Sequence, residues 1–419
     1  MRFLDIVAGL LGLPLLGVPL AILSALGVPC EVRRSLIVGR RARLIARRTL
    51  VFGEGRRAAL AERLRLPHFF DMLSLLRGDL ALVGPRPLTP VDGHAFAAYR
   101  VVLRPGLISP YAVQQRANIA YDSEEAVDFT YAQRRSFAGD LGLLVRAFLA
   151  GLHGTKQACP RPRIDLDGIP VDNVTLSGAV ARILAFLDHG ERRFVSFINA
   201  DCLNRAGRNS EYREALTTSD LVLGDGVGVR LMSRLLGQPL RENVNGTDLF
   251  PRLCGALEGT PHSVYLLGGR PGIAAAVALW IQTRHPACRI AGFQHGYFRD
   301  EDEAEVIANI RRSGASLLLV AFGAPGQELW LKDHLEETGA RVGIGVGGLF
   351  DFYSGRIPRA PQWMREAGLE WVYRFIQEPR RLFWRYGPGN VEFLSRAIAS
   401  AVRNRAHQGP ADAAARHAH

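Results

Sequence analysis

Four glycine-rich segments, each placed after a short apolar run, carry the residues of this chain that could do chemistry. They are residues 223–229, 268–272, 323–328 and 345–351. Glycines at such points let backbone N–H groups approach a phosphate, and the start of a following helix favours an anion. One such turn alone is often purely structural, but four of them together indicate a ligand crevice.

Asp225 is a carboxylate held between two glycines in the first of these segments. An aspartate after a strand commonly caps the helix that follows. In a crevice beside a nucleotide, the same carboxylate would serve as a general base for an attacking alcohol. The residues alone leave both roles open.

The elements that must position these segments begin at Ile164, where apolar, β-branched runs alternate with helical patterns. The alternation predicts an α/β fold, a mostly parallel Rossmann-like sheet with helices on both faces. Such a sheet binds its ligand beyond the carboxyl ends of its strands, where the glycine-rich segments fall. The predicted strands are residues 194–198, 221–223, 263–267, 289–293, 317–322 and 341–346.

The N-terminus has the composition of a membrane element, a helix over about residues 4–29. Residues 6–29 carry no charge, and a helix of that length would reach about 36 Å, enough to cross a bilayer core. Pro14 and Pro19 would kink it. A re-entrant helix is favoured over a plain spanning helix. A cleaved signal peptide is disfavoured by the length of the run, by Asp5 and by the arginines that follow.

Arginine supplies most of the positive charge, and much of it lies just after the apolar run. The chain has a formal net charge of +12, and residues 31–66 hold eleven Arg against three Glu. The positive-inside rule keeps such a segment on the cytoplasmic face, where it can meet anionic lipid. No nucleic acid is expected as a partner, because no known nucleic-acid-binding motif accompanies the charge.

The length of 419 residues suggests two to three domains, and the cysteines argue against a zinc site. Five scattered cysteines form no CxxC pair, and this pattern also argues against a disulfide framework. The pair Asp165 and Asp167 resembles a metal-binding DxD motif, but it lies at the entrance of the α/β domain. The expected parts are a small, α-rich, membrane-associated domain (1–152), a polar linker (153–163), the α/β domain (164–405) and a disordered tail (406–419).

Short motifs follow one another in a distinctive order from Gly168 onward. They are Gly168–Thr175, Asn199-Ala200, Asp225-Gly226, Asn245–Leu249, Gly268–Gly272, His295–Phe298, Gly323–Glu328, Gly347–Asp351, Arg359–Pro361, Gly368–Arg374 and Glu378–Arg381. In this order and spacing they resemble the WecG/TagA/CpsF family of glycosyltransferases. The resemblance implies transfer of a sugar, with inversion, from a UDP-sugar to a polyprenyl-diphosphate-linked acceptor, and it implies no metal or other cofactor.

The resemblance also implies a role for individual residues. Asp225 matches the proposed catalytic base. Arg374 and Arg381 belong to a C-terminal appendage over about residues 360–395, and they would hold the leaving diphosphate or the lipid-linked acceptor. Some members carry a threonine just ahead of the asparagine, where this chain has Phe197-Ile198, which bears on the identity of the donor or acceptor. The expected nucleotide-sugar and substrate contacts are Asn199, Gly226, Asn245, Thr247, Asp248, Gly268, Gly269, Gly323, Gln327 and Glu328.

The first 150 residues contain the string Arg77–Pro87, RGDLALVGPRP, and the marker Arg104–Gly106. These resemble the monotopic bacterial sugar transferases, which are polyprenyl-phosphate phosphoglycosyl transferases. That family carries an Asp-Glu pair ahead of a Leu-Pro-Gln, where this chain has Pro67 and His68, or Arg65 and Leu66 if a gap is allowed. Neither placement supplies a carboxylate nucleophile. The first domain is therefore expected to be a catalytically silent anchor.

These features predict a membrane-associated hexosyltransferase of bacterial exopolysaccharide or cell-surface polysaccharide synthesis, at the cytoplasmic face of the inner membrane. Its expected partners are a UDP-sugar, a polyprenyl-diphosphate-linked acceptor and membrane lipid, and an oligomer is allowed. A bifunctional enzyme that also primes the lipid carrier, and a non-catalytic scaffold, are the alternatives. A dehydrogenase is disfavoured because no GxGxxG is followed by a suitably placed acidic residue. Residues 371–386 interleave aromatic and Arg residues, which suits either a packed helix or an interfacial element.

Overall fold

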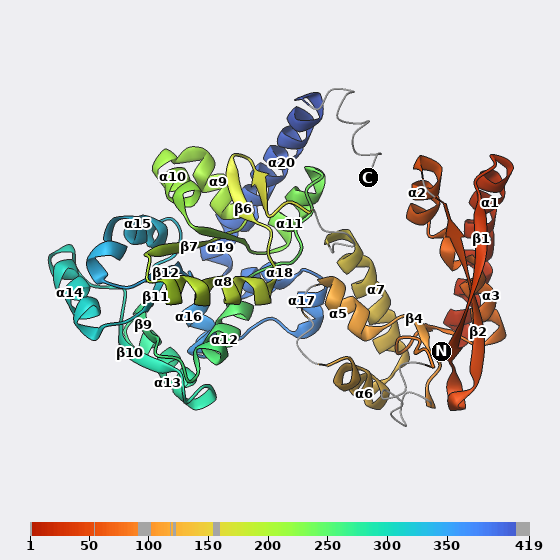
Figure 1. The fold of residues 1–419 in the computed structure, drawn as a ribbon, viewed down its shortest axis with the longest axis horizontal. Helices are drawn as coiled ribbons and strands as arrows, with labels where there is room; N and C mark the ends of the chain where they lie inside the picture. Colours follow the sequence, from red (N-terminus) through yellow and green to blue (C-terminus); the bar gives the residue numbers. More distant parts are fainter. Residues whose placement is uncertain are drawn as a thin grey trace. The chain divides into compact units, whose positions relative to one another are not determined.

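The computed structural model describes residues 2–53, 55–90, 102–117, 119, 123–153 and 160–407. These residues form two compact units, one of residues up to 153 together with 365–367, the other of residues 160–364 and 368–407. Residues 154–159 of the predicted linker and 408–419 of the predicted tail lie outside the described residues. Figure 1 shows the elements of both units.

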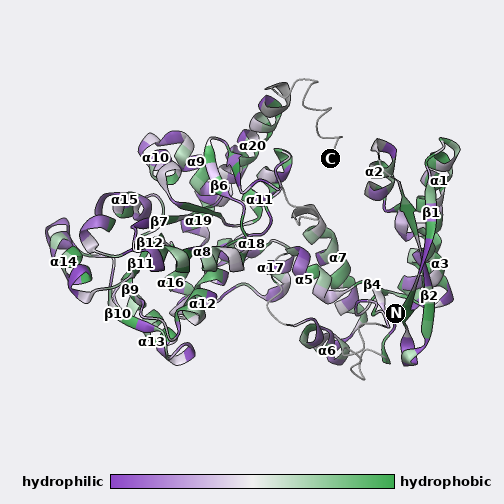
Figure 2. Cartoon of the chain, in the orientation of Figure 1, coloured by the Kyte–Doolittle hydropathy of each residue, from purple (hydrophilic) through white to green (hydrophobic). Residues whose placement is uncertain are grey.

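The first unit begins with α1 (Arg2–Ala25), a continuous helix that contains both Pro14 and Pro19. By length and composition it is long and apolar enough to cross a membrane, and Figure 2 colours most of its residues as hydrophobic. Glycines on one side of α1 let α3 (Phe69–Arg77) pack closely, because a Cβ at Gly9 would lie 2.7 Å from the Leu76 side chain. The Asp5 carboxylate accepts hydrogen bonds from Arg104 and from the Leu82 N–H.

The arginine-rich segment forms a long antiparallel hairpin that the sequence analysis did not anticipate. Its strands are β1 (Cys30–Val38) and β2 (Leu44–Phe52), paired with Arg34 opposite Arg48. Each strand begins or ends in β-branched and apolar residues, which favour strands. The dense charge between them obscured that pattern. The rest of the unit comprises α2 (Arg56–Arg63), a parallel pair β3 (Ala81–Val83) and β4 (Gly106–Ile108), α5 (Pro110–Ala117), α6 (Glu124–Arg134) and α7 (Phe137–His153).

The second unit is built on a six-stranded, wholly parallel sheet in the order β10-β9-β11-β12-β7-β8. All six predicted strands are confirmed, with ends that differ by no more than one residue. They are β7 (Arg193–Ile198), β8 (Leu221–Gly224), β9 (Ser263–Gly268), β10 (Arg289–Gln294), β11 (Leu317–Ala321) and β12 (Val342–Gly345). A separate hairpin, β5 (Arg163–Leu166) and β6 (Ile169–Asp172), precedes the sheet.

Helices cover both faces of this sheet, as predicted for an α/β domain (Figure 1). One face packs against α8 (Leu176–His189), α12 (Gly246–Leu257), α13 (Ile273–Arg284) and α16 (Leu349–Tyr353). The other packs against α9 (Ala200–Arg208), α10 (Ser210–Thr218), α11 (Val227–Leu235), α14 (Glu303–Ser313), α15 (Gly326–Thr338) and α20 (Pro388–His407). Three short helices precede α20: α17 (Gln362–Glu366), α18 (Glu370–Gln377) and α19 (Pro379–Tyr386).

Candidate active site

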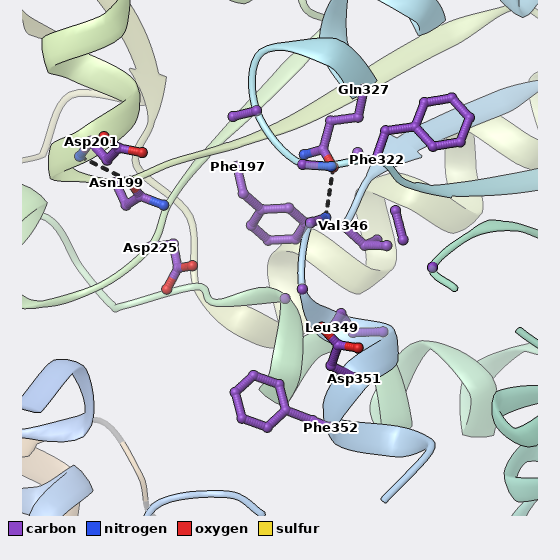
Figure 3. A pocket seen from close by; sticks show the side chains of 18 of the residues that line it. Phe197, Asn199, Asp201, Asp225, Phe322, Gln327, Val346, Leu349, Asp351 and Phe352 are labelled. Carbon is purple, nitrogen blue, oxygen red and sulfur yellow. Dashed lines mark hydrogen bonds between the residues drawn. The ribbon is translucent and has the colours of Figure 1, made fainter. Parts of the chain in front are cut away.

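A cavity of about 630 Å³ opens at the carboxyl ends of the strands of the second unit. This is where a parallel sheet places its ligand crevice, and the volume lies in the range of small-molecule sites. Residues that follow all six strands line it (Figure 3), among them Asn199, Asp225, Gly269, Gly296, Gly323 and Gly347.

The glycine-rich turn after β9 has two residues with backbone conformations that disfavour a side chain. Gly268 has φ +126°, and a Cβ there would fall 2.7 Å from the backbone of Ala321 on the neighbouring strand. Gly269 follows with φ +70° and donates its N–H to the Ala321 carbonyl at 3.2 Å. Glycine is therefore required for the close approach of this loop to β11.

Gln327 holds two of the loops together from the first turn of α15. Its side-chain oxygen accepts the N–H of Gly323 at 3.1 Å and the N–H of Gly347 at 2.7 Å. The first loop follows β11 and the second follows β12, so a single amide fixes the spacing of two walls of the cavity. Gln327 also lines the cavity itself (Figure 3).

Glu328 lies behind this amide and is fully buried. Its Oε1 accepts the amide N–H of Gln327 at 2.7 Å, whereas its Oε2 has no hydrogen-bond partner. Burial raises the pKa of Glu328 to about 7, against the opposing hydrogen bond from Gln327. The carboxyl therefore orients Gln327 from outside the cavity wall, and in its protonated form it needs no counter-ion.

Asp225 follows β8 and lines the cavity (Figure 3). It does not cap α11, whose N-cap is Gly226 and has no side-chain cap. Backbone bonds hold the turn: the Asp225 N–H donates to the Ile198 carbonyl, and the Gly226 N–H donates to Asn243 Oδ1. Among the described residues, no group donates a hydrogen bond to the Asp225 carboxylate, which is therefore available to a ligand.

The surroundings of Asp225 raise its pKa to about 7. Burial is the main cause, and the negative charge of Glu370 adds to it, while Arg374 and Arg385 act in the opposite direction. A carboxylate with a pKa near neutrality is matched to general-base catalysis at physiological pH.

The polar residues on α9 and α12 divide between the cavity and the packing behind it. Asn199 lines the cavity and caps α9 through hydrogen bonds from the N–H groups of Asp201 and Cys202. Thr247 also lines it. Asn245 caps α12 and donates to Asp248, whose other oxygen contacts Arg359. Neither Asn245 nor Asp248 is in the wall, so they position α12 rather than contact the cavity.

Arginine dominates the charged part of the wall. Arg374 lies over the Phe352 ring, with the guanidinium carbon 4.5 Å from the ring centroid, and Arg381 pairs with Glu378 at 2.5 Å. Sequence reasoning did not single out the other wall arginines, although Arg385 follows Arg381 by one helical turn. The arginines of the wall are Arg205, Arg270, Arg356, Arg374, Arg381 and Arg385, against the acidic residues Asp201, Asp225 and Asp351.

The structure brings together most of the residues singled out from the sequence, and leaves the others just outside the wall. Those in the wall are Asn199, Asp225, Thr247, Gly269, Gly323, Gln327, Arg374 and Arg381, and those outside it are Gly226, Asn245, Asp248, Gly268 and Glu328. Phe197 also lines the cavity. In the part of the chain that the structure describes, no cluster of three or more His, Cys, Asp or Glu could hold a metal ion.

The fold and the composition of this cavity agree with the comparison to known proteins. The profile of the glycosyl transferase WecG/TagA/CpsF family matches residues 164–407, more than half of the chain. The chain belongs to this family. It is therefore a glycosyltransferase of the hexosyltransferase class, and the cavity lies within the matched residues.

Two relatives belong to the same family. One is the N-acetylglucosaminyldiphosphoundecaprenol N-acetyl-beta-D-mannosaminyltransferase of Bacillus subtilis, 32% identical over 209 residues, which are 48% of this chain and 81% of the relative. The enzyme of the same name from Bacillus spizizenii is 32% identical over 200 residues, 48% of this chain and 76% of the relative.

The first unit of this WecG/TagA/CpsF protein has a similarity of its own. The bacterial sugar transferase family matches residues 56–154. Near the place expected for the nucleophile of that family, Asp71 is buried and accepts two hydrogen bonds from Arg47, at 2.8 and 2.7 Å, and lies 2.8 Å from His68 Nδ1. Burial opposes its ionisation, but these hydrogen bonds outweigh it and lower the pKa of Asp71. The carboxylate is thus engaged in packing α3 against β2.

Proposed function

We propose that the second unit transfers a sugar, with inversion, from a UDP-sugar to a saccharide linked to a polyprenyl diphosphate. The observation that carries this is Asp225, an unpaired carboxylate with a pKa of about 7 in a cavity walled by glycine loops and arginines. The printed names of both relatives describe transfer to a sugar on diphosphoundecaprenol, which supports the acceptor class.

The residues of the cavity suit each step of such a displacement. Asp225 takes the proton of the acceptor hydroxyl as its oxygen attacks the anomeric carbon of the donor. The bond from that carbon to the diphosphate breaks on the opposite face, so the configuration inverts. UDP leaves with an added negative charge, which Arg374 and Arg381 stabilise by charge-assisted hydrogen bonds. No step needs a metal ion, because the arginines of the wall supply positive charge at the leaving diphosphate.

The first unit, in this proposal, is a catalytically silent anchor at the cytoplasmic face of a bacterial inner membrane. The apolar α1 supports membrane association, and the exposed Arg33, Arg34 and Arg48 of the β1–β2 hairpin suit anionic headgroups. The hydrogen bonds from Arg47 to Asp71 support the proposal that this unit does not catalyse phosphoglycosyl transfer, because a nucleophile must be free to attack phosphorus. The product would enter an exopolysaccharide or another cell-surface polysaccharide.

A radiolabel transfer assay tests the proposal. Membranes that contain the full chain are given a panel of labelled UDP-sugars and two acceptors, bare undecaprenyl phosphate and an undecaprenyl-diphosphate-linked monosaccharide. We expect label in the second acceptor only. Label in bare undecaprenyl phosphate would show that the first unit primes the carrier, which is the bifunctional alternative. Label in neither acceptor with any donor would contradict the proposed reaction.

A further inference from the structure

Four of the six arginines of the cavity wall form two groups, one at Asp201 and one at the helix that carries Asp351. Arg205 of α9 and Arg385 of α19 both contact Asp201. Arg356 contacts Asp351, and Arg374 lies over Phe352 in the same helix as Asp351. In Figure 3, Asp225 lies between Asp201 and Asp351.

The group at Asp201 presents two unused guanidinium ends. Arg205 Nε is 2.9 Å and Arg385 Nε is 3.6 Å from the same oxygen of Asp201. Among the described residues, the terminal nitrogens of Arg205 and Arg385 make no hydrogen bond or ion pair, and both side chains line the cavity. Two positive charges against one negative charge favour an anion, and planar guanidinium groups bind phosphate oxygens in pairs.

Arg374, of the group at Asp351, lies in a part of the wall that suits a nucleotide. Arg374 and Arg270 line the cavity and have no acidic partner among the described residues. The glycine loops at Gly269, Gly323 and Gly347 border the same part of the sheet, beyond β9, β11 and β12. The aromatic rings of Phe322 and Tyr297 also belong to the wall there, and such rings can stack on a base.

The Asp201 group instead adjoins an exposed apolar surface. Phe383 and Trp384, which immediately precede Arg385 on α19, are 51% and 74% exposed. An apolar chain attached to a phosphate bound at Arg385 could lie along these rings. Arg374 and Arg385 both act on Asp225, since each opposes the rise of its pKa, so both groups are close to the proposed base.

We propose that the cavity binds two diphosphates at once, with Asp225 between them. Arg205 and Arg385 hold the diphosphate of the lipid-linked acceptor, and Arg270 joins Arg374 and Arg381 in holding the diphosphate of the nucleotide-sugar. This assignment rests on the proposed function and deepens it. It names Arg205 and Arg385 as determinants of acceptor binding, which the sequence pattern does not indicate.

Steady-state kinetics on the full chain separate the two groups. With each substrate varied in turn, Arg205→Gln and Arg385→Gln should raise the KM for the lipid-diphosphate acceptor about tenfold each, the effect of losing one charged hydrogen bond. The Kd for UDP, measured by calorimetry, should stay within about twofold. Arg374→Gln should instead raise the Kd for UDP about tenfold and leave the KM for the lipid-diphosphate acceptor within about twofold. Arg192→Gln is the matched control, because Arg192 is an exposed arginine paired with Glu336, and it should change neither constant.

A binding experiment that needs no turnover completes the test. Inorganic pyrophosphate should bind to UDP-saturated protein, and this binding should be weakened about tenfold or more in Arg205→Gln. The two-diphosphate assignment is wrong if UDP-saturated protein binds no pyrophosphate. It is also wrong if Arg205→Gln and Arg385→Gln raise the Kd for UDP as much as the KM for the acceptor. Pyrophosphate binding of the expected kind in a chain without transfer activity would support the second anion site and reject the proposed function instead.

Discussion

At the scale of single residues, the chemistry of Asp225 depends on groups that are distant in the sequence. Burial in the cavity and the charge of Glu370 raise its pKa, and Arg374 and Arg385 limit the rise. Asp225 lies between two glycines at the end of β8, and its carboxylate caps no helix. The sequence showed the residue and its two alternative roles, and the three-dimensional surroundings favour the role of a base.

The raised pKa of Asp225 predicts the pH dependence of transfer. A general base acts in its ionised form, and burial moves the pKa of Asp225 up to about 7. We therefore expect kcat/KM to fall about tenfold per pH unit below about pH 7 and to level off above it. Initial rates between pH 5 and 9 at low substrate concentration measure this. A profile that stays flat down to pH 5 would contradict the assignment.

Glu328 gives a second residue-scale prediction, for stability. Because burial raises its pKa to about 7, the unfolded chain loses this proton at lower pH than the folded chain, and stability falls as pH rises from about 4.5 to 7. Glu328→Gln removes this cost and keeps an oxygen for Gln327. The variant should gain thermal stability over the wild type at pH 8 and show little gain at pH 4.5. Equal differences at both values would show that folding does not raise the pKa of Glu328.

At the scale of elements, the positions of the strands could be predicted from the sequence, but which loops lie together in the cavity wall could not. The six β-branched runs identify β7 to β12 because a doubly covered parallel strand is apolar along its length. The order of the strands decides which of the loops that follow them lie side by side. The packing of α19 then brings Arg385 into the same wall as Arg205, although 180 positions separate the two residues. Motif spacing also cannot tell a residue in the wall, such as Thr247, from one behind it, such as Asp248. The β1–β2 hairpin was missed because its charge obscured its strand pattern.

The turn after β9 gives a prediction at this scale. Gly268→Ala would place a methyl group 2.7 Å from the backbone of Ala321, at a φ that costs about 1–2 kcal/mol for a side chain. We expect β9 to shift from β11, with a loss of about 3 kcal/mol of stability and weaker UDP binding. Gly314→Ala is the matched control: its φ is +65°, and a Cβ there meets nothing within 4 Å. Denaturant unfolding of both variants measures the difference in stability. Equal losses would show that the contact with β11 adds nothing to the cost of the substitution.

At the scale of the whole molecule, a glycosyltransferase unit is joined to a unit that carries one apolar helix. The WecG/TagA/CpsF family matches residues 164–407, and two relatives align over 48% of this chain and over most of their own length. The first unit matches a different family over residues 56–154, with Asp71 engaged by Arg47 rather than free. This division supports an anchor that brings the catalytic unit to its lipid-linked acceptor.

Truncation tests the proposed anchor. A fragment that begins at Arg163 retains every residue of the cavity wall and should transfer sugar to a water-soluble, short-chain acceptor at close to the full-length rate. On a long-chain acceptor in vesicles it should be at least about tenfold slower, because it loses the membrane affinity of α1. Equal rates on the vesicle acceptor with and without residues 1–162 would remove the role of the anchor.

The most direct test of the account is the activity of Asp225→Asn. The amide has the size of the carboxylate but cannot accept the proton of the acceptor hydroxyl, and the residue makes no side-chain contact that folding requires. We expect transfer to fall by a factor of about 10³ or more, while UDP binding measured by calorimetry stays within about twofold of the wild type. A variant that keeps most of its transfer activity would show that Asp225 is not the base.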